Sequence, residues 1–251
     1  MSVSAESQVA LVTGAAQGLG QHIARKLHTA GYRVVLSDVD GEAAHGAAQL
    51  LDSSGNTALG LCLDVARQSG FETALNQVLE HWGALHVLVN NAAVTRATPV
   101  MEISAEEFNN IVNINLGGTF VGCQVIGRHM AEQGYGRIIN LSSLAGQNGG
   151  TSTGAHYAAS KGGILTLTKV FAKELAAQGV TVNAIAPGPI DSPMVKALVP
   201  ESRLPSLLAA IPVGQLGDAD FIGDAVVQLA RPEAAFVTGA TWDINGGLFM
   251  R

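Results

Sequence analysis

Tyr157 and Lys161 are four positions apart in the segment His-Tyr-Ala-Ala-Ser-Lys-Gly-Gly. If this segment is helical, a phenol and an ammonium lie on one face. A tyrosine titrates near ~10, and lowering its pKa to ~7 requires about 4 kcal/mol of preferential phenolate stabilisation. A positive charge at ~4 Å in an effective dielectric of ~20 supplies roughly that amount. The pair could act as an acid/base device, although this spacing also occurs by chance on many helices.

Two serines precede the pair, at the end of an apolar run typical of a buried strand. The run contains Ile138, Ile139 and Leu141 and leads into Ser142 and Ser143. A hydroxyl at the carboxyl end of a strand can face the ligand crevice of an open α/β sheet. Ser143 is therefore a candidate for contact with a substrate.

A glycine-rich segment near the start of the chain has the context that a phosphate-binding loop needs. Residues 9–12 form a short apolar strand, which runs into Thr13-Gly14-Ala15-Ala16-Gln17-Gly18-Leu19-Gly20. A helix is expected next, because Ile23, Leu27 and Ala30 recur at helical spacing. Glycines let the backbone approach a pyrophosphate, and a helix N-terminus offers free N–H groups. These residues predict nucleotide binding.

The second predicted strand, 33–37, ends at Asp38, eighteen residues after Gly20. An acid at this place suits hydrogen bonds to the adenosine ribose hydroxyls. It also repels a 2′-phosphate, since a like charge at ~4 Å costs about 4 kcal/mol at an effective dielectric of ~20, about a thousandfold in affinity. Gln17 and Val39 offer no compensating cation, so NAD is favoured over NADP. The alternative is that Asp38 is an ordinary turn residue.

Strand and helix segments alternate along the chain without a linker, repeat or low-complexity tract. Beyond the glycine-rich segment, strands are predicted at 33–37, 57–63, 85–89, 137–142, 180–186 and 238–244. Helices are predicted at 42–51, around 71–79, and at 104–130, 156–175 and 218–231. This alternation predicts an α/β fold, a parallel sheet with helices on both faces.

The predicted helix 104–130 carries two local signals. Ser104 is expected to cap its N-terminus, with Glu107 three residues later as the capping-box partner. Asn115 falls mid-helix, where asparagine is mildly unfavourable. This residue is either functional or faces solvent.

Two polar residues near these motifs are weaker candidates. Arg96 could touch a substrate, but a solvated loop arginine is the simpler reading. His156 adjoins Tyr157 but points to another side of the predicted helix.

Residues 189–213 differ from the rest of the chain. They contain the prolines Pro189, Pro193, Pro200 and Pro205 together with Met194 and many Leu and Ala residues. A long apolar segment with irregular breaks predicts a lid over a substrate pocket.

The composition argues against several classes of protein. The 251 residues carry a net charge of −6 and no basic run, which argues against nucleic acid and anionic membranes as partners. Cys62 and Cys123 form no metal or disulfide pattern, which fits a reducing cytoplasm, and no ligand spacing predicts a catalytic metal. The polar stretch 1–8 lacks a signal-peptide core, and no apolar run is long enough to span a membrane. Only 14% of residues are charged, which suggests further buried surface and hence an oligomer.

Together these motifs resemble the short-chain dehydrogenase/reductase family in its single-domain oxidoreductase branch. The resemblance extends from Val9 to Gly247 and rests on Thr13-Gly14-x3-Gly18-x-Gly20, Asp64, Asn90-Asn91-Ala92, Asn115, Ser143, Tyr157-x3-Lys161 and Pro187-Gly188. It implies a single-domain Rossmann fold over residues 1–251, with a doubly wound, mostly parallel seven-stranded sheet. Ala93 replaces the usual glycine after Asn-Asn-Ala. The interval of fourteen residues from Ser143 to Tyr157 is about one longer than expected, so Ser142 remains an alternative to the preferred Ser143.

The resemblance also implies roles for individual residues. Tyr157 is the general acid/base, and Lys161 lowers its pKa and holds the nicotinamide ribose. Ser143 hydrogen-bonds the substrate oxygen, and Asn115 supports a water-linked proton relay. The residues expected to bind NAD are Gly14, Gln17, Gly18, Leu19, Gly20, Asp38, Asp64, Val65, Asn91, Ala92, Tyr157, Lys161, Pro187, Gly188, Ile190 and Ser192.

Within the family, the segments 95–96, 211–214 and 237–247 look like those of 3-oxoacyl-acyl-carrier-protein reductases. Two features of this chain differ from those of such reductases. Asp38 favours NAD, whereas that biosynthetic step usually uses NADPH, and the loops 132–135 and 176–179 lack the basic residues that such reductases present to an acidic carrier.

We therefore expect an NAD(H)-dependent dehydrogenase of a small secondary alcohol or ketone, with the carrier-protein reductase as the alternative. The resemblance implies a homotetramer. A catalytically idle NAD-binding protein is a reading of a different class, and the intact Ser/Tyr/Lys/Asn set argues against it.

Overall fold

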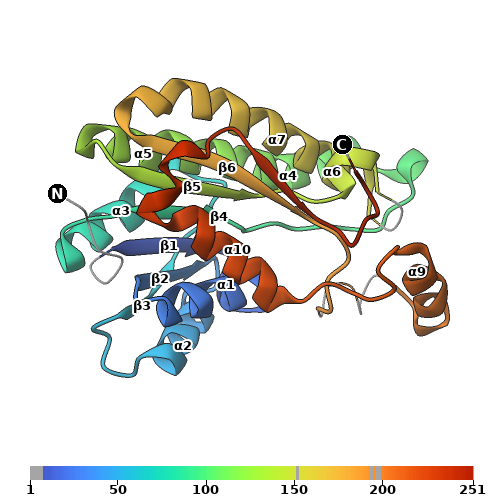
Figure 1. Cartoon of the computed structure of the whole chain (residues 1–251), viewed down its shortest axis with the longest axis horizontal. Coiled ribbons are helices and arrows are strands. Elements are labelled where there is room, and N and C mark those ends of the chain that lie inside the picture. Colours follow the sequence, from blue (N-terminus) through green and yellow to red (C-terminus); the bar gives the residue numbers. More distant parts are fainter. Residues whose placement is uncertain (1–7, 151–152, 193–194, 196–198, 251) are drawn as a thin grey trace.

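The computed structural model describes residues 8–150, 153–192, 195 and 199–250. These residues form one sheet of seven parallel strands with helices on both faces (Figure 1). The strands lie in the spatial order β3-β2-β1-β4-β5-β6-β7. Their bounds are β1 Val9–Thr13, β2 Arg33–Asp38, β3 Ala58–Cys62, β4 Val87–Asn90, β5 Gly136–Leu141, β6 Val180–Pro187 and β7 Thr241–Ile244. The fold class predicted from the sequence is confirmed.

Each face of the sheet is covered by a layer of helices with its own apolar core. The helices of one layer are α1 (Gly18–Thr29), α2 (Gly41–Leu51) and α10 (Ala219–Ala230). The main helices of the other are α3 (Gln68–Trp82), α5 (Gly118–Gln133) and α7 (Ala155–Leu175). The strands are buried on both sides, which explains why most of them read as continuous apolar runs rather than alternating ones.

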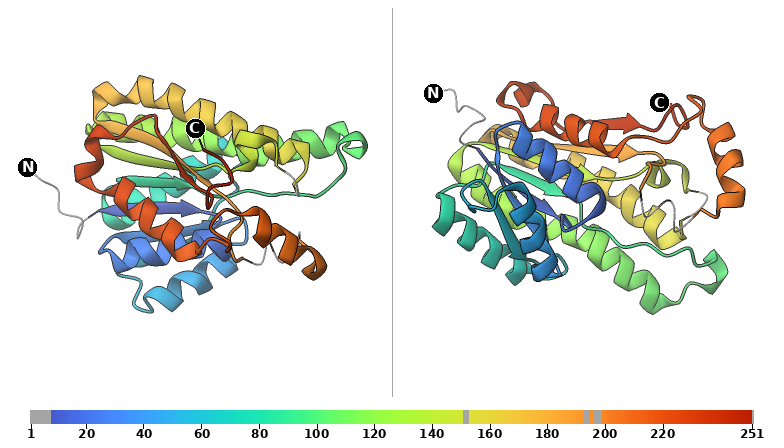
Figure 2. Two further views of the ribbon diagram at one scale, coloured as in Figure 1. Left: turned by 45° about the vertical axis from the view of Figure 1, so that its right-hand side comes forward. Right: turned by 90° about the horizontal axis from the view of Figure 1, so that it is seen from below.

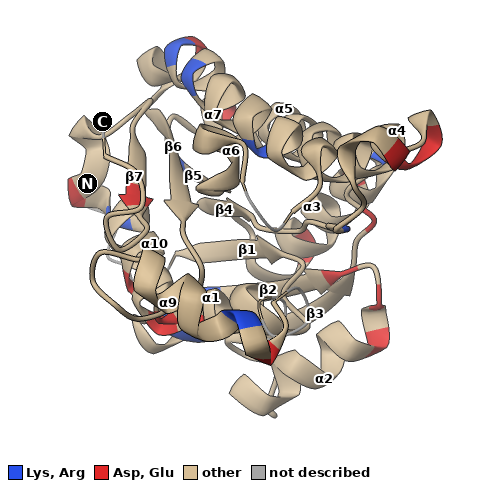
Figure 3. Ribbon diagram, turned by 90° about the vertical axis from the view of Figure 1, so that its right-hand side faces the viewer, with Lys and Arg blue, Asp and Glu red and all other residues tan. Residues whose placement is uncertain are grey.

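The strand order reverses beside β1, since β2 and β3 lie on one side of it and β4 to β7 on the other. In open α/β sheets a ligand binds outside the carboxyl ends of the strands at such a switch point. Figure 3 looks onto this edge, where the loops after β1, β4 and β5 come together. The fold therefore brings the glycine-rich segment and the serine–tyrosine segment to one crevice.

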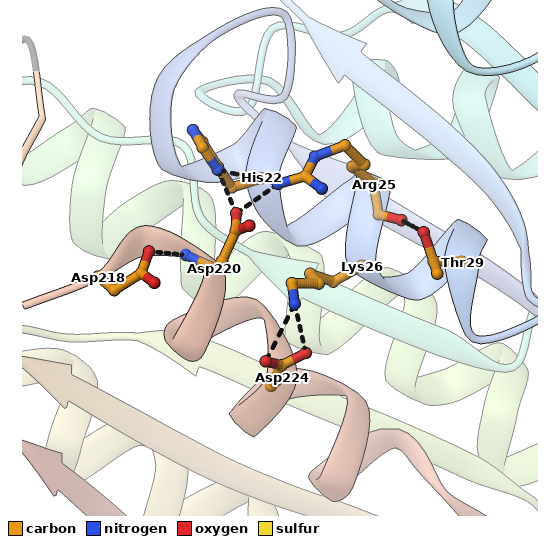
Figure 4. A network of polar contacts seen from close by, with 7 residues as sticks. All are labelled: His22, Arg25, Lys26, Thr29, Asp218, Asp220 and Asp224. Atoms are coloured by element: carbon orange, nitrogen blue, oxygen red, sulfur yellow. Dashed lines mark hydrogen bonds and ion pairs between the residues drawn. The ribbon is translucent and has the colours of Figure 1, made fainter.

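Helix α1 is held against α10 by a network of ion pairs (Figure 4). The Asp220 carboxylate receives His22 Nδ1 at 2.5 Å and the Arg25 guanidinium. These two partners lower the pKa of Asp220 to about 2. Lys26 Nζ lies 2.9 Å from Asp224 Oδ1 on the next turn of α10. The network fixes the direction of α1, whose N-terminus faces the crevice.

The helix predicted at 104–130 is interrupted. It consists of α4 (Ala105–Val112), a π-helical segment (Asn113–Gly117) and α5, which runs on to Gln133. Asn115 lies within the π-helical segment and is fully buried, so the reading of a surface-facing asparagine was wrong. A π-bulge admits one extra residue per turn and is frequent at functional sites.

The last strand is shorter than the predicted 238–244, since β7 begins at Thr241. The Asn183 side chain donates to the Val237 carbonyl at 2.7 Å and accepts from the Ala240 N–H at 3.1 Å. Gly239 has a positive φ of 72°. The chain stays hydrogen-bonded to β6 here, since the Gly239 N–H donates to the Val182 carbonyl at 2.8 Å, but side-chain contacts and the positive φ of Gly239 replace regular strand pairing.

Within the predicted lid, residues 193–194 and 196–198 lie outside the described residues, including Pro193 and Met194. The segment ends in the 3-10 turn Glu201–Arg203 and the helix α9 (Leu204–Ala210). Figures 1 and 2 show α9 projecting beyond the two layers at the carboxyl edge of the sheet. In the described part of the chain, no helix is long and apolar enough to cross a membrane.

The packing of α5 against the sheet predicts a cost for a side chain at Gly122. A Cβ there would lie 2.5 Å from Asn90 Oδ1 and 2.9 Å from the Phe71 ring. Overpacking costs about 1–3 kcal/mol, which exceeds the gain of about 1 kcal/mol from replacing a helical glycine. Gly122→Ala should therefore lower the free energy of unfolding, measured by denaturant titration.

Gly46→Ala is the matched control, because it lies in α2 with nothing within 4 Å of an added Cβ. This variant should gain about 0.5–1 kcal/mol. Stabilisation by both variants would contradict the packing described here.

Candidate active site

Tyr157 and Lys161 lie on the first two turns of α7 and face the end of β5. Lys161 Nζ is 5.6 Å from the centre of the Tyr157 ring and donates a 2.6 Å hydrogen bond to the Leu141 carbonyl. Both side chains are buried, with 8% and 3% of their residues' surface exposed. The helix thus places phenol and ammonium together, as the four-residue spacing predicts.

The electrostatics differ from the sequence-based expectation. Burial raises the pKa of Tyr157, and a hydrogen bond with Ser143 opposes this shift. Burial also lowers the pKa of Lys161 to about 8. The expectation that the ammonium lowers the phenol pKa did not include desolvation, which disfavours the charged form of both groups.

The two consecutive serines point in different directions. The Ser143 hydroxyl hydrogen-bonds the Tyr157 phenol and accepts the Ala145 N–H at 3.1 Å. The Ser142 hydroxyl donates to the Lys161 main-chain carbonyl at 2.8 Å. Ser143 therefore faces the phenol, whereas Ser142 ties the end of β5 to α7.

Asn115 holds the loop that follows β4 against α7. Its carboxamide accepts the Val94 N–H at 2.8 Å and donates to the Val94 carbonyl at 2.9 Å. It also donates to Ser160 Oγ at 3.1 Å. Both ends of the carboxamide are engaged, so in this structure the Asn115 side chain positions its neighbours.

The glycine-rich loop between β1 and α1 is built by close backbone approach. Gly14 has a φ of 62°, and a Cβ on it would lie 2.8 Å from the Ala92 Cα. A Cβ on Gly20 would overlap the Gly14 carbonyl. Asn91 Nδ2 donates to the Thr13 and Gly14 carbonyls at 2.9 and 3.0 Å. Asn91 and Ala92 thus fix the shape of the loop.

The N-terminus of α1 suits the phosphates of a nicotinamide dinucleotide. Among the described residues no side chain caps it at Gln17, and its first turn contains no acid. Gly18 has a φ of 59°, and a Cβ on it would meet nothing within 4 Å. Free N–H groups beside open space fit a pyrophosphate. Leu19 instead packs against the apolar core.

Asp38 ends β2 at the same edge. Among the described residues, its carboxylate accepts two long hydrogen bonds, from the Ala16 and Asp40 N–H groups at 3.3 Å each. It retains capacity for a hydroxyl donor. Asp64 differs, because it accepts from Ala66 N at 3.0 Å and from Arg67 Nε at 3.1 Å.

The remaining predicted cofactor residues lie on the loops of the same edge. Val65 follows Asp64, is buried and packs close to Gly118. Pro187 ends β6, and the Gly188 N–H donates to the Ile244 carbonyl at 2.8 Å. Ile190 is buried and Ser192 Oγ accepts the Val195 N–H at 3.3 Å; both lie just beyond this turn.

The sequence reading missed a cluster around His156. This side chain is fully buried; its Nδ1 accepts the Tyr157 N–H at 2.8 Å, and its Nε2 lies 2.8 Å from Glu107 Oε1. His156 must therefore carry its proton on Nε2. Arg96 lies 3.6 Å from the other oxygen of Glu107, and its side chain is 70% exposed, so it is a solvated loop arginine with an ion-pair contact to Glu107.

Only half of the expected capping box forms. Ser104 Oγ accepts the Glu107 N–H at 3.0 Å, while the Glu107 side chain reaches His156. The sequence contained one signal for the His156–Glu107 contact, namely a histidine next to the tyrosine together with an acid in the first turn of another predicted helix.

A cavity of about 630 Å³ opens beside the N-terminus of α7. Its wall consists of loop residues 97–100, residues 149 and 153–155, and the segment 199–210. The predicted lid thus forms one wall of a cavity that adjoins the N-terminus of α7. Within the described residues, no three His, Cys, Asp or Glu side chains gather as metal ligands.

Comparison with known proteins places this site in a family. The sequence model described as enoyl-(acyl carrier protein) reductase matches residues 14–249. The 3-oxoacyl-[acyl-carrier-protein] reductase FabG of Vibrio cholerae is 40% identical over 245 residues, 98% of each chain. That of Escherichia coli K12 is 38% identical over 247 residues, again 98% of each chain.

This chain belongs to the short-chain dehydrogenase/reductase family. A crystal structure of a short chain dehydrogenase from Bacillus anthracis matches it with a TM-score of 0.89 and 30% identity over 99% of each chain. Membership makes the chain an oxidoreductase that uses a nicotinamide cofactor. The names of its relatives specify different reactions on carrier-linked acyl groups.

The His156 cluster predicts that Glu107 contributes to stability in a pH-dependent way. Hydrogen bonds from Thr98 and His156 lower the pKa of Glu107. Its stabilising contribution is therefore complete above the ordinary glutamate pKa and is lost as the pH falls through the lowered value. Glu107→Ala should reduce the denaturation midpoint at neutral pH, and its difference from wild type should shrink below about pH 4.

Glu106→Ala is the control, since Glu106 is exposed in the same turn. If the two variants lose equal stability, the buried pair with His156 contributes nothing beyond helix-end electrostatics.

Proposed function

We propose that this chain is an NAD(H)-dependent oxidoreductase that interconverts a small secondary alcohol and a ketone. The observation that carries the proposal is the cluster of the half-buried Ser143 with the buried Tyr157 and Lys161 at the carboxyl edge of the sheet. This edge also holds the glycine-rich loop and Asp38. Acid/base groups and a dinucleotide site thus share one crevice.

In the proposed mechanism, Tyr157 takes the hydroxyl proton during oxidation and returns it during reduction. Ser143 hydrogen-bonds the substrate oxygen and holds it against the phenol. Lys161 would hold the nicotinamide ribose of a bound cofactor, and its positive charge favours the phenolate. The nicotinamide cofactor supplies the hydride chemistry. Asn115 holds the loop after β4 against α7. It also supports a water-linked proton path from Lys161.

The proposed cofactor site rests on fit rather than on a bound nucleotide. Gly14, Gln17, Gly18 and Gly20 would receive the pyrophosphate at the α1 N-terminus. The other proposed contacts are those of Leu19, Asp38, Asp64, Val65, Asn91, Ala92, Pro187, Gly188, Ile190 and Ser192.

Reduction of a 3-oxoacyl group on an acyl carrier protein is the second candidate, favoured by the names of the relatives. Asp38 and the lack of basic residues in 132–135 and 176–179 argue against it. A catalytically idle NAD-binding protein is a third reading, and measured turnover of any alcohol or ketone would exclude it. We also propose that residues 1–251 form one domain, that 189–213 act as a lid over the substrate and that the protein is cytoplasmic.

Asp38 predicts which of the two nicotinamide cofactors the protein prefers. Its carboxylate repels a 2′-phosphate, so NADH should bind at least about tenfold more tightly than NADPH. Fluorescence titration of both cofactors measures this ratio. Asp38→Asn should reduce it, and equal affinity of the wild type for both cofactors would refute the assignment of NAD.

Substitution of the catalytic pair should separate chemistry from binding. Tyr157→Phe should reduce turnover by about 10² or more while NADH affinity stays nearly unchanged. Lys161→Ala should reduce both turnover and NADH affinity. It should also shift the rate-controlling pKa of oxidation upward, because the phenolate loses a neighbouring positive charge.

The measurements are NADH fluorescence titrations and initial oxidation rates across a range of pH, with a panel of alcohols and ketones. Wild-type turnover in Tyr157→Phe would show that another group delivers the proton.

We further propose a homotetramer assembled through α5, α7 and the C-terminal strand. The rings of Phe120 and Phe171, on α5 and α7, are 5.8 Å apart, and Phe120 and Val170 are 40% and 55% exposed. Exposed apolar surface on two long helices is characteristic of an interface. Light scattering at micromolar concentration should give about four times the chain mass of 25.8 kDa; the mass of one chain would refute the assembly.

A further inference from the structure

The cavity beside α7 has a polar wall in addition to its apolar one. Thr98, Thr153, Arg203 and Ser206 line it together with small and apolar residues such as Leu207. The four polar residues come from three segments, namely the loop after β4, the approach to α7 and the lid. A chamber for a purely aliphatic substrate would not need this arrangement.

Arg203 is the one cation among the described residues that line the cavity. Its guanidinium forms no ion pair with any residue that the structure describes. Ser206 Oγ donates to its main-chain carbonyl at 2.8 Å, which orders the backbone at this point. Arg96 directly precedes the cavity-lining residues 97–100, but it forms an ion pair with Glu107. Arg203 is exposed at the cavity wall, so its guanidinium is available to an anion.

Thr153 supplies the second observation. Its Oγ1 is buried and has no hydrogen-bond partner among the described residues. Thr153 lies in the cavity wall directly before Gly154, which caps α7. A buried hydroxyl without a partner costs about 1–3 kcal/mol. Oγ1 lies next to Gly150, where an added Cβ would be 2.8 Å away. Rotation of the side chain about its Cα–Cβ bond would bring the hydroxyl to a ligand group that accepts its hydrogen and so recover this cost.

We propose that the cavity binds the carboxylate of the substrate through Arg203 and Thr153, which makes the substrate class hydroxy acids and their oxo acids. A guanidinium fork matches the two oxygens of a carboxylate, and Thr153 Oγ1, turned toward the cavity, donates to one of them. A protein with net charge −6 repels anions in general, so an anionic substrate requires a dedicated cation. The inference rests on the proposed function, because it assumes that the carbonyl end lies at Tyr157.

The reaction balances without a further reactant. The hydroxy acid loses a hydride to the oxidised nicotinamide and its hydroxyl proton to Tyr157, which yields the oxo acid and the reduced cofactor. The carboxylate keeps its charge throughout. It serves only to bind and orient.

The test compares acids with uncharged partners of the same skeleton. The substrates are 3-oxobutanoate, 4-oxopentanoate and 5-oxohexanoate, each paired with its methyl ester. The rate of each reduction is measured through the oxidation of NADH. The chain-length series allows for the distance between carbonyl and carboxylate. The proteins are the full-length wild type, Arg203→Gln, Arg203→Lys and Thr153→Val, with Arg33→Gln as the control at the opposite end of the strands.

We expect at least one acid to have a lower KM than its ester in the wild type. Arg203→Gln should raise the KM of that acid by about tenfold or more, the scale of a hydrogen bond to a charged group. The KM of its ester and the kcat of both should hardly change. Arg203→Lys should recover part of the loss, Thr153→Val should give a smaller rise, and Arg33→Gln should give none.

Equal effects of Arg203→Gln on acid and ester would assign Arg203 to lid structure and overturn the inference. With 3-oxobutanoyl-coenzyme A as an additional substrate, an increase in KM confined to this thioester would assign Arg203 to a phosphate and overturn the inference as well. Turnover of neutral ketones alone, with no acid preference, refutes the inference but leaves the proposed function standing. If no alcohol or ketone reacts, the proposed function fails. Calorimetric titration of the three acids into wild type with NAD⁺ and into Arg203→Gln then decides the carboxylate site separately.

Discussion

The site depends on a reciprocal pair of buried hydrogen bonds between α7 and the end of β5. Lys161 Nζ donates to the Leu141 carbonyl at 2.6 Å, and the Ser142 hydroxyl donates to the Lys161 carbonyl at 2.8 Å. Water does not compete at these buried atoms, so an unmade bond would cost about 1–3 kcal/mol. Gly146 allows the close approach, because a Cβ there would lie 2.5 Å from the Lys161 carbonyl carbon. The phenol of Tyr157 faces a serine because helix and strand are fixed to each other in this way.

A second set of contacts fixes the other side of the crevice. Asn115 binds both main-chain groups of Val94, and His156 joins the start of α7 to Glu107 on α4. These side chains satisfy backbone or ring groups that would otherwise be buried without partners. The same contacts place the loop after β4 opposite the lid. The walls of the cavity are therefore set by residues that lie outside its lining.

Burial also determines the electrostatic state of the catalytic pair. It raises the pKa of Tyr157 and lowers the pKa of Lys161 to about 8, so the charged form of each group is disfavoured. The hydrogen bond from Ser143 acts against this for the phenol. A ligand that brings charge into the crevice changes both pKa values together, because the two groups share one desolvated environment.

The sequence by itself determined the seven-stranded α/β architecture, the glycine turn and the common face of Tyr157 and Lys161. These features follow from local periodicity and chain order, which any stretch of sequence displays. Only the tertiary structure decided that Ser143 faces the phenol, because successive residues at a strand end point in opposite directions. It alone joined Glu107 to His156, which are 49 residues apart. It also reversed the expected shift of the Tyr157 pKa, since desolvation depends on what surrounds a group and not on its spacing along the chain.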